Sequence, residues 1–299
     1  MKAPLILVIY RQSTYTEMLS DDTPNSTAEM LRREEPLVSD IMQAHKAHLA
    51  SMERVKEILS RRELSSTWRH DFSDVNPDDF NLVITVGGDG TVLHASHSIG
   101  STPVLALNSS PKTSAGYFTA GDVDKLPELL NRIEDNTLET TALRRMAVMV
   151  NDDLMNARVL NDVLFSHECP ASTTRYLITH GEDSQEQTSS GVWVSTAAGS
   201  TAAIRAAGGK VMRFGSRRLQ FVVREPGSSG GADNLCRATI TKGFVTADKP
   251  LSIQSKTSTA RLYIDGPHVV RPVNFGDIIT FYGATEPLLL LGHRSKNNA

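Results

Sequence analysis

Short apolar segments alternate with helical patterns in the first half of the chain. Residues 5–10, 81–86 and 104–107 are nearly continuous apolar runs, which are typical of buried strands. Apolar residues recur at helical spacing over residues 41–58, and a second helical pattern covers residues 124–133. This alternation of strand and helix predicts a doubly wound α/β domain at the N-terminus.

The second half of the chain has a different pattern. Its apolar runs are short, β-rich and separated by Gly, Ser, Asn and Asp. The strands predicted there are residues 148–150, 157–160, 176–179, 192–194, 219–223, 238–240, 260–264 and 278–282. Only residues 200–208 have a helical pattern. We therefore expect an α/β phosphate-loop domain at 1–143, a mostly β dinucleotide-binding domain at 144–280, and a C-terminal segment at 281–299 that returns to the first domain.

Composition and charge narrow the class of protein. The 299 residues are 39% hydrophobic and 22% charged, as in a globular protein rather than a disordered or membrane-spanning one. The net charge of -3 argues against a strongly basic nucleic-acid binder. Cys169 and Cys236 do not form a CxxC pair, so neither a disulfide scaffold nor a zinc site is indicated. The first apolar run is too short for a transmembrane helix or a signal peptide, and we expect a cytoplasmic protein without a membrane partner.

The chemistry of the first half is concentrated in residues 87–91, Gly-Gly-Asp-Gly-Thr, which directly follow a predicted strand. Glycines at a strand end leave backbone N–H groups free to cradle phosphate, and a helix predicted to start near Val92 adds a field that favours anions. The carboxylate of Asp89 would repel a phosphate, so its presence indicates a proton acceptor or a magnesium contact. The alternative is a tight turn with a structural aspartate.

This loop resembles the GGDGT signature of the NAD kinase family, which lipid kinases and phosphofructokinases share in similar form. Further motifs of the NAD kinases follow in the family's order, at residues 160–163 (LNDV), 195–203 (STAAGSTAA), 208–209 (GG) and 263–266 (YIDG). Segments within residues 108–118, 189–191 and 224–226 resemble the mitochondrial-type branch of the family. The chain is interpreted as a bacterial relative of that branch.

The resemblance implies a kinase that transfers the γ-phosphoryl group of ATP, with Mg²⁺, to the 2′-hydroxyl of NAD. It implies that Asp89 is the catalytic base. The phosphates of ATP would be held by Gly87, Gly88, Gly90 and Thr91. The NAD-binding residues it implies are Asp89, Gly90, Tyr117, Asn161, Asp162, Ser200, Thr201 and Ala202. It also implies a homodimer or homotetramer.

Some positions depart from the family's pattern. Ser190 stands where many NAD kinases have Asp, Ala203 where a Tyr is expected, and Pro267 where a Gln is expected. These departures concern nicotinamide recognition, and they leave room for a non-catalytic dinucleotide-binding sensor. The loop alone is also compatible with a lipid or sphingoid-base kinase, but the later motifs favour NAD.

Each of the other motifs, taken alone, can be explained by a purely structural role. Residues 161–162 can be a turn, residues 265–266 a hairpin turn, and residues 200–209 a capped core helix. Among the basic residues, Lys112 could reach a phosphate from its loop. The pair at 217–218 could meet ATP or another subunit, although a solvated surface pair is favoured.

Overall fold

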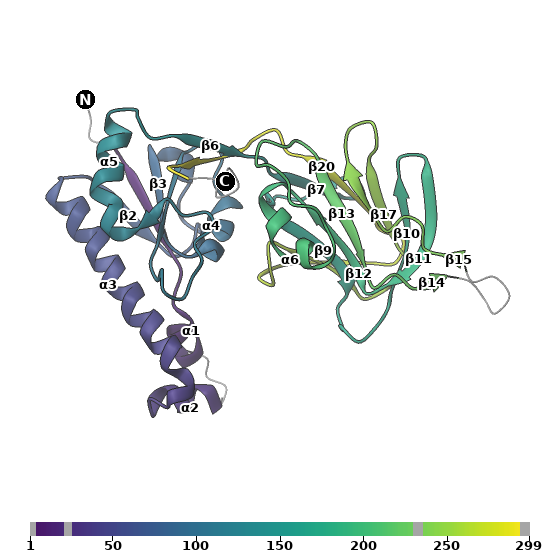
Figure 1. Ribbon diagram of the computed structural model, residues 1–299, viewed down its shortest axis with the longest axis horizontal. Coiled ribbons are helices and arrows are strands. Elements are labelled where there is room, and N and C mark those ends of the chain that lie inside the picture. Colours follow the sequence, from purple (N-terminus) through teal and green to yellow (C-terminus); the bar gives the residue numbers. More distant parts are fainter. Residues whose placement is uncertain (1–3, 21–25, 230–235, 294–299) are drawn as a thin grey trace. The chain divides into compact units, whose positions relative to one another are not determined.

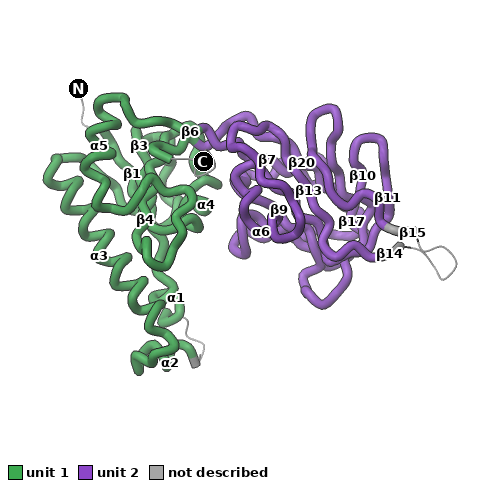
Figure 2. The backbone as a smooth tube through the Cα atoms, viewed as in Figure 1, with its two compact units in different colours: residues 1–141, 289–299 green, residues 142–288 purple. Residues whose placement is uncertain are grey.

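The computed structural model describes residues 4–20, 26–229 and 236–293, and the chain divides into two compact units (Figure 2). Unit 1 comprises residues 1–141 and 289–299, and unit 2 comprises residues 142–288. The return to unit 1 therefore lies at 288/289 and not at the expected position 280/281. The reason is that strand β20 (Ile278–Gly283) pairs with two strands of unit 2 and remains part of its sheet.

Unit 1 is built on a seven-stranded sheet with the order β2-β1-β3-β4-β21-β6, and β5 pairs with β4. The pairs β1–β2, β1–β3, β3–β4, β4–β5 and β4–β21 are parallel. The strands are β1 (Ile6–Tyr10), β2 (Ser66–Arg69), β3 (Leu82–Gly87), β4 (Val104–Asn108), β5 (Gly121–Asp122), β6 (Thr140–Leu143) and β21 (Leu288–Leu291). This arrangement is the α/β architecture that the first half of the sequence predicts.

Helices follow these strands in unit 1 (Figure 1). They are α1 (Thr14–Ser20), α2 (Ser26–Arg32), α3 (Ser39–Arg61), α4 (Asp89–Ser96) and α5 (Leu126–Glu134), with 3₁₀ turns η1 (Pro36–Val38), η2 (Pro77–Asp79) and η3 (Val123–Lys125). Helix α3 contains the predicted pattern at 41–58, and it buries Val55, Ile58 and Leu59 against the sheet and α5. Alternate residues of β1 point to the opposite face, where α4 contacts β1 and β3.

Unit 2 contains two six-stranded antiparallel sheets whose inner faces share one apolar core. Their orders are β11-β10-β17-β20-β7-β8 and β16-β13-β12-β9-β18-β19, and a short β14–β15 pair is separate. Besides β20, the strands are β7 (Met146–Val150), β8 (Asp153–Leu154), β9 (Asp162–His167), β10 (Thr174–His180), β11 (Asp183–Ser189), β12 (Gly191–Ser195), β13 (Leu219–Arg224), β14 (Ser228–Ser229), β15 (Cys236–Arg237), β16 (Lys242–Val245), β17 (Leu251–Ser255), β18 (Ala260–Ile264) and β19 (Val269–Val273).

Two predicted strands of unit 2 are wrong, and in both cases a side chain takes the place of a neighbouring strand. Residues 157–160 form only a bridge between Val159 and Met146, because the N–H of Leu160 donates to the carboxylate of Asp265. Residues 238–240 form no strand, because two of their N–H groups donate to the side-chain oxygen of Gln185.

The predicted helix at 200–208 is also wrong as a single element. It consists of a 3₁₀ turn η4 (Ala198–Thr201) and a short helix α6 (Ala203–Ala206), separated by Ala202 at φ −85° and ψ −145°. The hydroxyl of Ser200 donates to the carbonyl of Ala197 and accepts the N–H of Met212, which fixes the first turn apart from the second. No described helix is long and apolar enough to cross a bilayer.

Candidate active site

The phosphate loop is formed where β3 ends and α4 begins. Gly88 is the N-cap of α4, so Asp89 occupies the first turn, where a negative charge is favourable. A Cβ atom on Gly87 would lie 2.0 Å from Oγ1 of Thr91, and one on Gly88 would lie 2.8 Å from Oγ of Ser114. The buried Thr91 therefore requires glycine at position 87, whereas a side chain at position 88 would displace only the hydroxyl of Ser114; together the glycines keep the backbone of the loop open to a ligand.

The carboxylate of Asp89 is held by the backbone of a second loop. Its Oδ2 accepts the N–H of Tyr117 at 2.9 Å, and its Oδ1 accepts the N–H of Phe118 at 2.8 Å. Two such bonds orient the carboxylate, while each oxygen keeps further lone pairs. Asp89 is half-buried, so it is both fixed and accessible.

Tyr117 lies beside Asp89, but its ring already has partners within unit 1. It packs edge-on against Phe118, with ring centroids 5.3 Å apart, and against His293 at 6.2 Å. Nε2 of His293 lies 2.9 Å from the carbonyl oxygen of Tyr117. His293, which the sequence did not single out, thus ties the returning C-terminal segment to the loop that holds Asp89. The expected role of Tyr117 beside adenine remains a prediction.

A cavity of about 680 Å³ adjoins the phosphate loop in unit 1. It is lined by Gly87, Gly88 and Thr91, together with the basic side chains of Arg11 and Lys112. His48 of α3 also lines it and is buried, with Nδ1 2.8 Å from the hydroxyl of Ser109. Glycine N–H groups with basic side chains around one cavity are the donors that a polyphosphate requires.

In unit 2, the carboxylate of Asp265 organises the motif at 160–163. It accepts N–H groups from Leu160 at 2.8 Å, Asn161 at 2.7 Å and Asp162 at 3.0 Å. Asp265 adopts φ +49° in the hairpin turn between β18 and β19. Residues 265–266 therefore form the predicted hairpin turn and are at the same time part of the family motif. The bonds account for the fixed backbone at residues 160–162.

Asp162 is the second carboxyl group of this cluster and is buried, with 6% of its surface exposed. Burial, and to a lesser extent the nearby charge of Asp265, raises the pKa of Asp162 to about 7. Burial also raises the pKa of Asp265 to about 6, although its three N–H partners favour the charged form. The proton of the pair therefore resides on Asp162 and the charge on Asp265.

The glycine-rich motif of unit 2 packs directly on Asn161. The hydroxyl of Thr196 donates to the carbonyl of Leu160 at 2.5 Å, and the N–H of Thr196 donates to the carbonyl of Asn161 at 2.9 Å. A Cβ atom on Gly199 would lie 2.2 Å from the carbonyl oxygen of Asn161. Oδ1 of Asn161 is buried without a hydrogen-bond partner among the described residues, so its capacity as an acceptor is unused within this part of the chain.

The structure thus brings the predicted residues together in two groups. Gly87, Gly88, Asp89, Gly90, Thr91 and Tyr117 form the group of unit 1, and Asn161, Asp162, Ser200, Thr201 and Ala202 belong to the motif loops of unit 2. Within the second group, Ser200 is fully buried and its hydroxyl is used within the protein, whereas Thr201 and Ala202 are half-buried. No cluster of three or more potential metal-binding side chains occurs among the described residues.

Comparisons with known proteins define the class to which this fold and this loop belong. Residues 10–138 match the family model of the ATP-NAD kinase N-terminal domain. An NAD kinase from Archaeoglobus fulgidus in complex with ATP superposes with a TM-score of 0.67 at 17% identity, covering 98% of this chain and 94% of that one. Yeast NADH kinase complexed with NADH superposes with a TM-score of 0.69 at 16% identity, covering 99% and 85%. These two structures establish the fold.

Sequence relatives establish the family. A probable NADH kinase from Oryza sativa is 33% identical over an alignment of 259 residues, covering 78% of this chain and 78% of that one. An NADH kinase from Arabidopsis thaliana is 35% identical over 260 residues, covering 78% of this chain and 80% of that one. The chain belongs to the NAD kinase family of phosphotransferases.

Proposed function

We propose that the protein transfers the γ-phosphoryl group of ATP to the 2′-hydroxyl of NAD, giving NADP, with Asp89 as the base. The placement of Asp89 carries the proposal: two backbone N–H groups orient its carboxylate in the first turn of α4, within a loop whose glycines leave room for phosphate. Binding alone does not require a proton acceptor among phosphate-binding donors.

In the proposed reaction, Asp89 accepts the proton as the 2′-oxygen attacks the γ-phosphorus. The new phosphorus–oxygen bond forms while the bond to the β–γ bridging oxygen breaks, and ADP leaves. Gly87, Gly88, Gly90 and Thr91 hold the phosphates, and Lys112 and Arg11 supply positive charge from the adjacent cavity. Magnesium, bound to ATP, neutralises phosphate charge when present. Catalysis then rests on positioning and charge neutralisation.

Unit 2 would recognise the dinucleotide. The unpartnered Oδ1 of Asn161 offers an acceptor, and the protonated carboxyl of Asp162 offers a donor. Thr201 and Ala202 would contact NAD directly. Ser200 would position the loop, because its hydroxyl already has two backbone partners.

The redox form of the acceptor is a separate question, because the 2′-hydroxyl is the same in NAD and NADH. The 33–35% identical plant relatives are named NADH kinases. At Ser190, moreover, a charge found in many NAD kinases is missing. A direct comparison of the two forms is therefore part of the test.

The decisive experiment offers Mg-ATP with NAD, NADH, a diacylglycerol and a sphingoid base to the purified protein. We expect NADP or NADPH and no phosphorylated lipid. Binding of NAD and NADH without turnover would replace the proposal by a dinucleotide sensor, and lipid phosphorylation would replace it by a lipid kinase. Inorganic polyphosphate in place of ATP tests the donor.

A further inference from the structure

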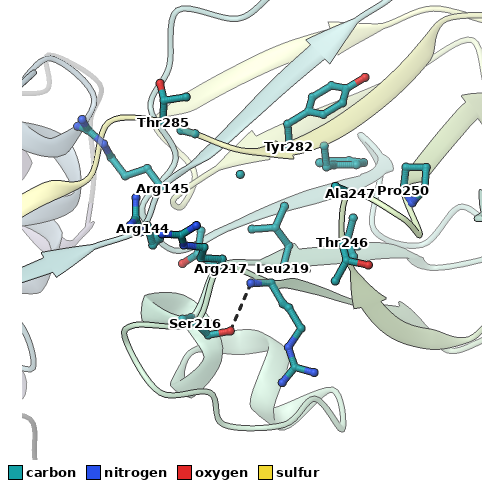
Figure 3. A pocket seen from close by; sticks show the side chains of 17 residues that line it. Arg144, Arg145, Ser216, Arg217, Leu219, Thr246, Ala247, Pro250, Tyr282 and Thr285 are labelled. Carbon is teal, nitrogen blue, oxygen red and sulfur yellow. Dashed lines mark hydrogen bonds between the residues drawn. The ribbon is translucent and has the colours of Figure 1, made fainter.

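Unit 2 contains a second cavity, of about 690 Å³, whose residues are all distinct from the phosphate loop. It opens at one end of the β-sandwich, where the residues before β7, the loop before β13, the end of β16 and the segment after β20 come together (Figure 3). Cavities of this size accommodate small-molecule ligands, and a nucleotide falls within the range.

The lining of this cavity carries four arginines and no acidic residue. They are Arg144, Arg145, Arg217 and Arg218. Arg145 is fully buried and committed to the fold: its Nε donates to the carbonyl of Glu286 at 3.0 Å, and its guanidinium lies 3.9 Å from the Glu286 carboxylate. The guanidinium of Arg218 stacks on the ring of Phe244 at 4.2 Å.

Arg144 and Arg217 are different from these two. Neither makes a hydrogen bond or an ion pair with another described residue, although Arg144 is half-buried. In Figure 3 the two side chains reach from different segments toward the same side of the cavity. Like charges at one cavity, without a carboxylate to compensate them, are unfavourable in the free protein and favourable once an anion binds.

The rest of the lining fits the other parts of a nucleotide. Leu219, Val245 and Phe281 are buried and form an apolar wall. Tyr282 also lines the cavity and is 46% exposed, and an aromatic ring can stack on a base. Planar guanidinium groups bind phosphate oxygens in bidentate fashion, which an ammonium group cannot do.

We propose that this cavity is a nucleotide-binding site, in which Arg144 and Arg217 hold two or more phosphate groups and Tyr282 stacks on the base. Arg144, Arg217 and Tyr282 lie outside the phosphate loop and outside the motifs at 160–163 and 195–203, although Thr196 and Ala197 of the second motif also line the cavity. The arginines would recognise phosphate groups, and ATP, NADPH and inorganic tripolyphosphate are ligands that carry them.

The test is a calorimetric titration of the full-length protein with ATP, NADPH and tripolyphosphate in turn. We expect the double variant Arg144→Ala/Arg217→Ala to lose one bound ligand per chain, or to bind it at least about tenfold more weakly, equivalent to 1.4 kcal/mol. The matched control is Arg205→Ala/Arg213→Ala, which removes the same charge from exposed positions outside the cavity and should bind as the wild type does.

Two further variants keep the test decisive. Tyr282→Ser should weaken ATP binding but leave tripolyphosphate binding unchanged, because only ATP has a base to stack. Arg217→Gln changes one exposed side chain without a partner, so it reports on the site if the double variant does not fold. Equal affinity and stoichiometry in the cavity variants and the control would overturn the proposal. NADP formation, measured in parallel, would be unaffected by that outcome.

Discussion

The two units hold their carboxyl groups in opposite ways. In unit 1, Asp89 is half-buried in the first turn of a helix, and two N–H groups fix its two oxygens. In unit 2, the buried Asp162 and the half-buried Asp265 both have raised pKa values, and Asp265 accepts three backbone N–H groups. The first arrangement holds an oriented carboxylate within reach of a substrate. The second uses a carboxylate to shape the backbone.

The difference shows why an aspartate in a motif is not by itself a catalytic residue. Asp265 is part of a family motif, yet its carboxylate accepts three backbone N–H groups of another motif and thereby holds Asn161 in place. Asp89 accepts two backbone N–H groups in the first turn of α4, within the loop whose glycines leave room for a ligand.

The largest effect should come from Asp89→Asn. The amide keeps the size of the side chain but cannot accept the hydroxyl proton, so we expect turnover to fall about 10²–10⁴-fold. The measurement is the rate of NADP formation, with the melting temperature as a check on folding. Asp124→Asn, at an exposed acid of the same unit, is the control. Near-normal turnover in the Asp89 variant would remove this residue from the catalytic role.

The stability of unit 2 should decrease as the pH rises from about 4 to about 7. The folded protein raises the pKa of Asp162 to about 7, so it binds a proton that the unfolded chain has already released. The stabilisation is thus complete below the unfolded pKa and is lost as the pH rises through the folded one. The expected loss is on the order of 4 kcal/mol.

Chemical denaturation across this pH range measures the effect. Asp162→Asn, which imitates the neutral form, should reduce the pH dependence to the part that Asp265 contributes, whereas Asp183→Asn at an exposed position of β11 should leave it intact. An unchanged slope in the Asp162 variant would show that another group carries the proton.

A smaller effect is expected from Gly87→Ala. The new methyl group would meet Oγ1 of Thr91 at 2.0 Å, so the loop must shift, at about 1–3 kcal/mol of stability and with a loss of turnover. Gly90→Ala is the matched control, because its Cβ would meet only Nη1 of Arg11, at 3.9 Å. Adding Thr91→Ala to Gly87→Ala removes the nearest atom and should recover part of the stability. Equal melting temperatures for the two single variants would contradict the packing argument.

The smallest effect should come from Lys112→Ala. Lys112 is exposed at the cavity beside the phosphate loop, so losing its charge should raise the KM for ATP about fivefold, or roughly 1 kcal/mol, and change kcat little. Lys46→Ala, on an exposed position of α3 outside the cavity, is the control. If both variants have the same KM, Lys112 does not contact the donor.

Much of the fold was predictable because its signals are local. Continuous apolar runs gave β1, β3 and β4, and the pattern at 41–58 gave α3. Strand β11 was missed because it lies at the edge of its sheet and is polar throughout most of its length. The false strands at 157–160 and 238–240 have suitable residues, but Asp265 and Gln185 occupy their N–H groups from distant parts of the chain.

The phosphate loop and the order of the motifs can be read from the sequence, because glycine spacing and apolar periodicity act over a few residues. The difference between the carboxyl groups arises from the tertiary structure. Whether an aspartate can act as a base or holds the backbone in place depends on its burial and on N–H donors that are distant in the sequence. Asp89 and Tyr117 are 28 positions apart, and Asp265 and Asn161 are 104 positions apart. The same holds for Arg144 and Arg217, which become one cationic site only when the strands of unit 2 bring them to a single cavity.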